Sequence, residues 1–145
     1  MELPESIRET LQIWTEEGPD YLYENEPNSI RELTQFLDGR SLFVPELYRR
    51  TNYQPIMELR TGDSILVPRL TSWSRNPLMP DWKYEGIPSV KLVLRNTTVK
   101  GLNVSDISLY HGEGEVILSP GKLVVKSRFG DILLVDFLQD GTRLQ

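Results

Sequence analysis

The 145-residue sequence contains no cysteine and a single histidine, His111. The absence of cysteine excludes disulfide bonds, thiol catalysis and thiolate metal sites. A single histidine also argues against a metal site built from histidines and against a serine–histidine triad. Any chemistry that this chain performs is therefore expected to rest on carboxylates, hydroxyls and guanidinium groups, without a metal.

Positive charge is scarce as well, with 16 basic residues against 21 acidic ones and a net charge of -5. Proteins that bind nucleic acids usually carry the opposite sign, because neutralising phosphates supplies most of their affinity. A nucleic-acid partner is therefore disfavoured. No apolar run approaches the ~20 residues of a membrane-spanning helix. The opening residues MELPESIRET also lack the basic and apolar regions of a signal peptide. We expect a cytoplasmic protein without a membrane partner, and a toxin delivered into a host cytosol would have the same features.

The rest of the composition is that of an ordinary globular domain, with 39% hydrophobic and 26% charged residues. A chain of this length suits one compact domain, so we predict a single domain over residues 1–145. Its pattern changes from helical spacing in residues 1–40 to short β-rich segments in residues 41–145. The predicted fold class is α+β, with N-terminal helices packed on a mostly antiparallel, two-sheet β-body.

Helix signals are clear in the first third of the chain. Residues 4–14 repeat apolar side chains at helical spacing, and Gly18–Pro19 ends that run. Residues 28–39 predict a second helix in which Ser29 and Glu32 form a capping box. The predicted strands follow, at residues 41–50, 63–74, 89–96, 114–119, 121–128 and 131–139. Between them, the segment RNPLMPDWKYEGIP predicts a long, shaped loop, a kind of segment that is often functional.

Three polar pairs interrupt the predicted strands. They are Arg49 and Arg50, Ser72 and Ser74, and Glu113 and Glu115. Each pair has an ordinary structural explanation, namely solvated arginines at a strand end, hydroxyls on one face of a strand, and exposed charges before a strand. Because neighbouring residues of a strand face opposite sides, at most one of the two arginines is expected to point into a site.

Taken in chain order, the three pairs resemble the motifs of the arginine–serine–glutamate class of ADP-ribosyltransferases, which includes C3-like and binary toxins and several phage enzymes. The segment LYRR resembles the first motif, with Arg49 at its arginine. LTSWSRNP resembles the Ser-Thr-Ser strand, with Ser72 leading and Trp73 in place of the threonine. EGEVILSPG is similar to the Glu-x-Glu motif before a hydrophobic strand. The resemblance covers roughly residues 42–140, and the ordered trio is more specific than any one motif.

This resemblance implies NAD as the substrate and assigns roles to individual residues. Arg49 would hold the pyrophosphate or the adjoining ribose through paired hydrogen bonds. The backbone of Arg50 would hold the nicotinamide amide. Glu115 would stabilise the positive charge that builds on the ribose as the nicotinamide leaves. Ser72 would hold that carboxylate in place, with Ser74 as a helper.

The resemblance also implies a protein acceptor. Glu113 would lie at the end of a target-recognition turn and would prepare an arginine side chain of the target, since family members with glutamate here typically modify arginine. Tyr110 is placed in the same turn. In the proline-bounded loop, Trp82 or Tyr84 could stack on nicotinamide or cover NAD, or could equally anchor the loop to the core. Trp14 is expected to pack the helices against the sheet.

The predicted function is therefore an NAD-dependent mono-ADP-ribosyltransferase, a glycosyltransferase of toxin or phage-effector type that modifies a protein at arginine. Three alternatives stay open at this point. An NAD glycohydrolase would use water as the acceptor in the same site. A binding module of the same fold would have lost catalysis, as the tryptophan in the serine strand allows. An enzyme that modifies nucleic acid is disfavoured by the acidic charge. The target, the origin and the oligomeric state are not readable from the sequence.

Overall fold

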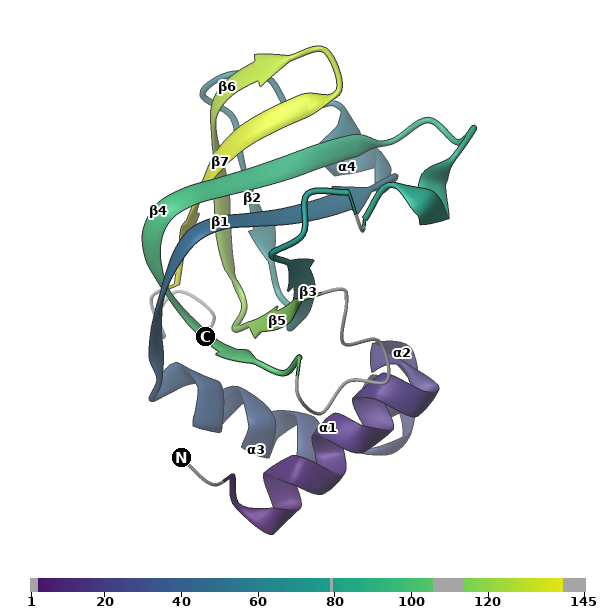
Figure 1. The fold of residues 1–145 in the computed structure, drawn as a ribbon, viewed down its shortest axis with the longest axis vertical. Helices are drawn as coiled ribbons and strands as arrows, with labels where there is room; N and C mark the ends of the chain where they lie inside the picture. The colour runs from purple at the N-terminus through teal and green to yellow at the C-terminus, as the bar shows by residue number, and fades with distance from the viewer. Residues whose placement is uncertain (1–2, 79, 106–113, 140–145) are drawn as a thin grey trace.

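The computed structural model describes residues 3–78, 80–105 and 114–139. Its α-helices are α1 (Glu5–Glu17), α2 (Pro19–Asn25), α3 (Pro27–Asp38) and α4 (Gln54–Met57), with a 3-10 helix η1 (Trp82–Tyr84). Its strands are β1 (Ser41–Thr51), β2 (Ser64–Val67), β3 (Thr71–Ser74), β4 (Val90–Asn103), β5 (Glu115–Leu118), β6 (Gly121–Phe129) and β7 (Ile132–Leu138). The predicted α+β class is confirmed. Helices precede strands, apart from the short α4 and η1 (Figure 1).

The N-terminal helices differ from the sequence prediction in two places. Helix α1 ends before Gly18 as predicted, and that glycine adopts φ 88°, which suits a residue without a side chain. Helix α2 was not predicted. Helix α3 starts at Pro27 with no side-chain cap, so the predicted capping box at Ser29 is wrong. Proline is favoured in the first helical turn because its missing N–H has no partner there, and the N-cap position is Glu26, three residues before Ser29.

In the described part of the chain, the seven strands form one hydrogen-bonded sheet in the order β1-β3-β5-β4-β7-β6-β2, with a further pairing of β1 and β4. The sequence predicted two sheets. The strands join into one sheet because β4 is long enough to pair with several of them. Its residues 90–100 pair with β1, residues 91–94 pair with β7, and residues 101–103 pair with β5. The β4–β7 pairing is parallel and the other pairings are antiparallel, as the prediction of a mostly antiparallel body required.

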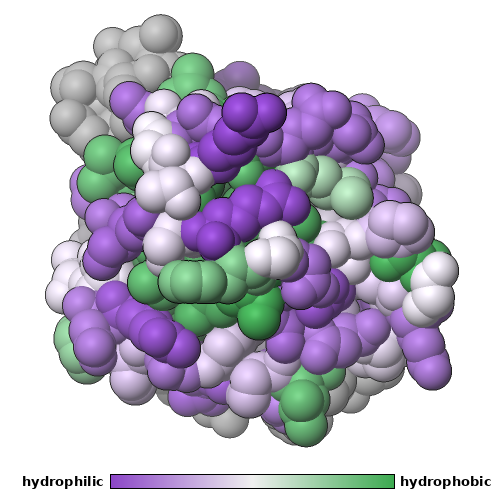
Figure 2. Space-filling view, turned by 90° about the horizontal axis from the view of Figure 1, so that it is seen from above, coloured by the Kyte–Doolittle hydropathy of each residue, from purple (hydrophilic) through white to green (hydrophobic). Residues whose placement is uncertain are grey.

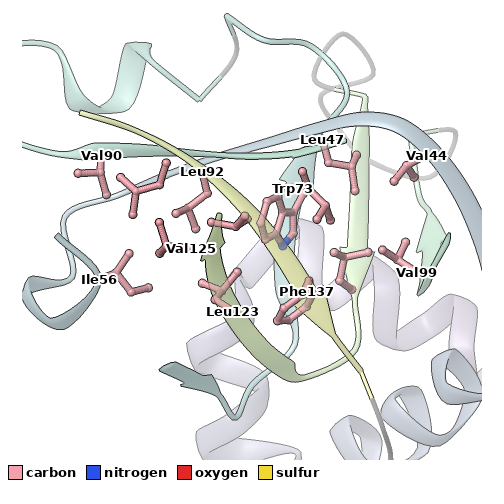
Figure 3. Packing of buried hydrophobic residues seen from close by; sticks show 14 of the residues in the cluster. Val44, Leu47, Ile56, Trp73, Val90, Leu92, Val99, Leu123, Val125 and Phe137 are labelled. Carbon is pink, nitrogen blue, oxygen red and sulfur yellow. The ribbon is translucent and has the colours of Figure 1, made fainter. Parts of the chain in front are cut away.

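Two hydrophobic clusters pack the two faces of this body. The first lies between the strands and includes Leu47, Trp73, Leu92 and Phe137, whose side chains converge in Figure 3. The second lies between the helices and the sheet. There α1, α2 and α3 contribute their apolar faces and β5 contributes Ile117. Figure 1 shows these helices together at one end of the molecule, beneath β3 and β5. Strands β3 and β5 therefore separate the two clusters.

The surface opposite the helical layer is mainly hydrophilic, with small apolar groups rather than one continuous patch (Figure 2). None of the helices in the described part of the chain is both long enough and apolar enough to cross a bilayer. The change from helix to strand falls between α3 and β1, where the sequence placed it. That residues 1–145 form a single domain stays a prediction.

Candidate functional site

Strands β3 and β5 bring a serine and a glutamate together on one face of the sheet. Ser74 pairs with Glu115 across the antiparallel ladder, and residues directly opposite each other share a face. Ser72, two residues earlier, lies on that face too. Its hydroxyl donates a hydrogen bond to Glu115 Oε2 at 2.6 Å. The structure therefore places Ser72 and Glu115 in direct contact, as the motif resemblance implied.

Glu115 has a second donor that the sequence analysis did not foresee. The indole Nε1 of Trp14 in α1 donates to the same oxygen, Glu115 Oε2, at 3.1 Å. Trp14 is 4% exposed and Glu115 is 7% exposed, so the contact is shielded from water. In the sequence Trp14 is recognisable only as part of an apolar helical face. No local pattern links it to a glutamate 101 positions later.

Arg49 lies where β1 and β3 diverge. The two strands pair at a single position, Tyr48 with Ser74, so a gap opens beside it. Arg49 Nη1 donates to the main-chain oxygen of Ser72 at 2.8 Å. Burial lowers the pKa of this guanidinium, while the nearby Tyr84 acts to raise it. The group stays protonated in proteins, so Arg49 places a largely buried positive charge next to Ser72.

Arg50 lies on the face that carries Ser74, because it follows Tyr48 by two residues. Its side chain does not point freely into the site. Nε donates to Asp81 at 3.0 Å, and Nη1 donates to Ser89 at 2.9 Å and to Asp131 at 3.3 Å. The resemblance assigned the backbone of Arg50 to ligand binding. The side chain of Arg50 makes these structural contacts instead.

Both arginines nevertheless border the same pocket, which has a volume of about 130 Å³. The expectation that at most one of the two arginines points into a site stays a prediction, since the Arg50 side chain is bound to Asp81, Ser89 and Asp131. Both arginines belong to the continuous ladder of β1 with β4, so their side chains leave opposite faces of the strand. The full lining is Arg49, Arg50, Ser72, Trp73, Ser74, Pro80, Lys83 and Tyr84.

The predicted long loop, residues 75–88, contributes to the lining of this pocket. Its two candidate aromatic residues occupy different positions. Tyr84 lines the pocket beside the arginines. Trp82 is 61% exposed and instead lines a neighbouring cavity of about 630 Å³. The loop starts from Ser74, whose hydroxyl accepts the N–H of Asn76 at 3.0 Å. Tyr84 is thus the loop aromatic placed at the site, and Ser74 shapes the beginning of the loop.

Asp81 fastens the loop to the sheet. Its carboxylate accepts hydrogen bonds from Arg50 in β1 and, at 3.1 Å, from Lys91 in β4, and the Lys91 ammonium also donates to the Pro77 carbonyl at 2.7 Å. Partial burial acts to raise the pKa of Asp81. The hydrogen bonds from Lys91 and Arg50, together with their positive charges, outweigh it and hold this pKa below its ordinary value. The sequence analysis did not identify this anchor.

A third cavity, of about 470 Å³, lies on the far side of the gap between β1 and β3. It shares Arg49 and Trp73 with the smaller pocket and is otherwise lined largely by apolar residues such as Leu70 and Leu92. Ligand pockets commonly measure ~300–1,000 Å³. The larger cavity falls within this range, the smaller pocket lies below it, and Arg49 lines both.

The tryptophan that replaces the family's threonine does not enter the glutamate's face of the sheet. Trp73 is 3% exposed and points into the cluster between the strands, where its ring lies 6.1 Å from that of Phe137 (Figure 3). Its indole N–H donates to Thr71 Oγ1 at 2.8 Å. The replacement therefore changes the packing of the core and leaves the Ser72–Glu115 contact intact.

Glu113 and Tyr110, which the resemblance assigned to target recognition, lie outside the described residues, as does His111. Within ranges 3–78, 80–105 and 114–139, no three histidine, aspartate or glutamate side chains lie close enough together to hold a metal ion. The described part of the site consists of Arg49, Arg50, Ser72, Ser74, Tyr84 and Glu115, to which the structure adds Trp14 and Asp81.

No protein-family model and no curated protein sequence matches the chain. Solved structures do. An ADP-ribosyltransferase toxin from Paenibacillus larvae, Plx2a, superposes with a TM-score of 0.67 at 17% identity, over 94% of this chain and 88% of that one. C3stau2 from S. aureus, solved with NAD, gives 0.68 at 14% identity over 96% and 89%. BECa, the ADP-ribosylating toxin of a C. perfringens binary enterotoxin, was solved with NADH and gives 0.65 at 15% identity over 94% and 44%.

These neighbours define the fold of the chain. It is the fold of ADP-ribosyltransferase toxins, as the sequence motifs predicted. At identities of this size the likeness concerns architecture, and activity has to be argued from the site.

Proposed function

We propose that this protein is an NAD-dependent mono-ADP-ribosyltransferase that modifies a protein acceptor at arginine. The observation that carries the proposal is the linkage of three motif residues through one serine. Ser72 donates its hydroxyl to Glu115 at 2.6 Å and accepts Arg49 on its main-chain oxygen at 2.8 Å. A guanidinium, a hydroxyl and a carboxylate from three strands are thus linked by hydrogen bonds, and Arg49 and Ser72 also line the same pocket.

The two cavities around Arg49 support NAD as the substrate. A half-buried guanidinium that lines both cavities can hold the pyrophosphate of a dinucleotide through charge-assisted hydrogen bonds. The compact pocket beside Ser72 and Tyr84 then takes the nicotinamide ring, and the larger apolar cavity takes the adenosine. Tyr84 offers an aromatic surface to the nicotinamide, and the loop above it limits access of water.

Glu115 supplies the electrostatic part of the reaction. As the bond between nicotinamide and ribose breaks, the ribose acquires positive charge, and the carboxylate stabilises that charge where it develops. Glu115 is 7% exposed, so water screens its charge little. The nicotinamide leaves with the bonding electron pair and the acceptor nitrogen then forms the new bond to the ribose carbon.

The arginine acceptor rests on Glu113. A guanidinium is protonated at neutral pH and needs an adjacent carboxylate to orient it and accept its proton. Glu113 precedes Glu115 by two residues in the sequence. The family resemblance gives this residue to the acceptor, and Glu115 to NAD.

Labelled NAD incubated with a bacterial or eukaryotic cell lysate tests the proposal directly. We expect the label to appear on protein and to be lost when Glu115 is replaced. Release of free ADP-ribose without labelled protein would identify an NAD glycohydrolase instead. Label that is removed by nuclease and survives protease would identify a nucleic-acid acceptor. Failure to bind NAD at all would contradict the enzymatic assignment and leave a binding module.

Replacement of Glu113 by alanine tests the acceptor separately. We expect transfer to arginine, measured with the small guanidine agmatine, to fall at least about a hundredfold. Hydrolysis of NAD should continue, because Glu115, Ser72 and Arg49 are unchanged. If Glu113→Ala leaves transfer to agmatine intact, the role assigned to Glu113 is wrong.

A further inference from the structure

We propose that Trp14 is a positioning residue for the catalytic carboxylate, so that the helical layer forms part of the active site. This inference rests on the proposed function for its catalytic consequence and on the described geometry for its structural one. Trp14 Nε1 donates to Glu115 Oε2 at 3.1 Å from a helix on the opposite side of the interface. None of the motif residues lies in that helix.

The two donors to Glu115 act on the same oxygen. Ser72 Oγ and Trp14 Nε1 both end on Oε2, at 2.6 Å and 3.1 Å. Together they fix the rotation of the carboxylate group, because two directed hydrogen bonds from different elements define its plane. We assign the other oxygen, Oε1, to the ligand. A single serine donor would leave the carboxylate free to turn about the bond from Cγ to Cδ.

Trp14 suits this task for chemical reasons. An indole N–H is a donor only, it carries no charge, and it does not titrate in the accessible pH range. A cation in this place would form an ion pair with Glu115 and compete with the positive ribose for the same carboxylate. The neutral indole orients the carboxylate and leaves its negative charge uncompensated.

The ring itself is held by packing. Trp14 is 4% exposed and belongs to the cluster that includes Leu11 and Ile117, and Ile117 is on the same strand as Glu115. The donor therefore has a fixed place relative to β5. Rigid support of this kind is what a catalytic group needs in order to stay within a fraction of an ångström of its working geometry.

Trp14→Phe is the variant that tests the inference, because it keeps an aromatic ring in the cluster and removes the N–H. We expect kcat for NAD cleavage to fall about tenfold or more, while KM for NAD changes less than about threefold. Tyr23→Phe is the matched control. It removes another hydrogen bond between the helical layer and the sheet, from Leu70 N to Tyr23 Oη at 2.8 Å, without touching Glu115. It should leave kcat unchanged.

A spectroscopic measurement tests the contact without any enzymatic turnover. The sequence has three tryptophans, so the wild-type protein labelled with ¹⁵N gives three indole N–H signals, and the Trp14→Phe spectrum identifies the one from Trp14. In Glu115→Met, which keeps a side chain of similar length and removes the carboxylate, we expect that signal to move upfield. An unchanged signal would contradict the hydrogen bond.

The outcomes separate this inference from the proposed function. Wild-type protein that neither binds nor cleaves NAD would refute the enzyme, while the indole signal would still report the contact. An active wild type with equal kcat in Trp14→Phe and Tyr23→Phe would refute the positioning role. An equal loss of kcat in both variants would also refute it, because the effect would then come from loosening the helical layer in general.

Discussion

Two carboxylates of this protein, Glu115 and Asp81, are held in opposite ways. Glu115 is 7% exposed and is held by two neutral donors, a serine hydroxyl and a tryptophan N–H. The Asp81 side chain is 39% exposed and is held by two cations, Arg50 and Lys91. Neutral donors fix a carboxylate and keep its charge available, whereas cations fix it by neutralising it. The first arrangement suits a group that acts on a ligand, and the second suits an anchor.

The two arrangements also differ in what disturbs them. Ion pairs at a partly exposed position weaken as salt rises, because mobile ions screen them. Hydrogen bonds in a shielded interface are affected far less. The fixed part of the site is therefore expected to be insensitive to salt, and the loop of residues 75–88, which carries Tyr84, is expected to be the adjustable part.

The largest expected effect comes from removing the negative charge of Glu115. Glu115→Gln should lower NAD cleavage by about a hundredfold or more, because the developing positive charge loses its counter-charge. The free energy of unfolding should stay the same or rise by ~1 kcal/mol, since a buried charge without a cationic partner is costly and the amide oxygen can still accept both donors. NAD cleavage assays measure the loss of activity, and urea unfolding measures the change in stability. A Glu115→Gln variant with wild-type activity would contradict the catalytic role of Glu115.

A smaller effect is expected from changing Asp81, which anchors the loop of residues 75–88. Asp81→Asn keeps the shape and removes the charge that pairs with Arg50 and Lys91. We expect KM for NAD to rise severalfold with kcat nearly unchanged, because the loop is less well placed over the pocket. Titrating salt is the discriminating measurement. Raising it should increase KM of the wild type toward that of the variant and should have little effect on the variant itself.

The smallest effect concerns pH. The pKa of Asp81 is held below its ordinary value, so the stability it contributes is complete above ~4, the pKa of an unfolded aspartate, and is lost as the pH falls through the lowered folded pKa. Amide hydrogen exchange of residues 80–88 should therefore accelerate at pH 3 relative to pH 6, after correction for intrinsic rates. Asp81→Asn lacks this dependence, and identical pH profiles for the two proteins would contradict the anchor.

The fold and part of the site were predictable because their signals are local. Apolar spacing identified α1 and most strands, and the order of Arg49, Ser72 and Glu115 along the chain carried the resemblance that predicted the architecture. The predicted start of α3 was wrong because the helix begins at Pro27 and has no side-chain cap. Helix α2 has only seven residues, too few for its periodicity to stand out.

The remainder depends on contacts between distant segments. The positions of Arg49 and Arg50 follow from the pairing of β1 with β3 and β4, whose register no sequence pattern specifies. The partners of Asp81 come from strands β1 and β4, and the partner of Glu115 comes from α1. Such contacts become visible only when the strand register is known, so the supporting residues of the site were missed while its motif residues were found.

The separation of 101 positions between Trp14 and Glu115 has a consequence for how the molecule becomes active. During synthesis the indole leaves the ribosome long before its acceptor does, and closing so long a segment costs entropy that only the finished tertiary structure can offset. The contact between Trp14 and Glu115 can therefore form only after β5, which begins at Glu115, has been translated. If the proposed activity is correct, competence for catalysis arises no earlier than this contact.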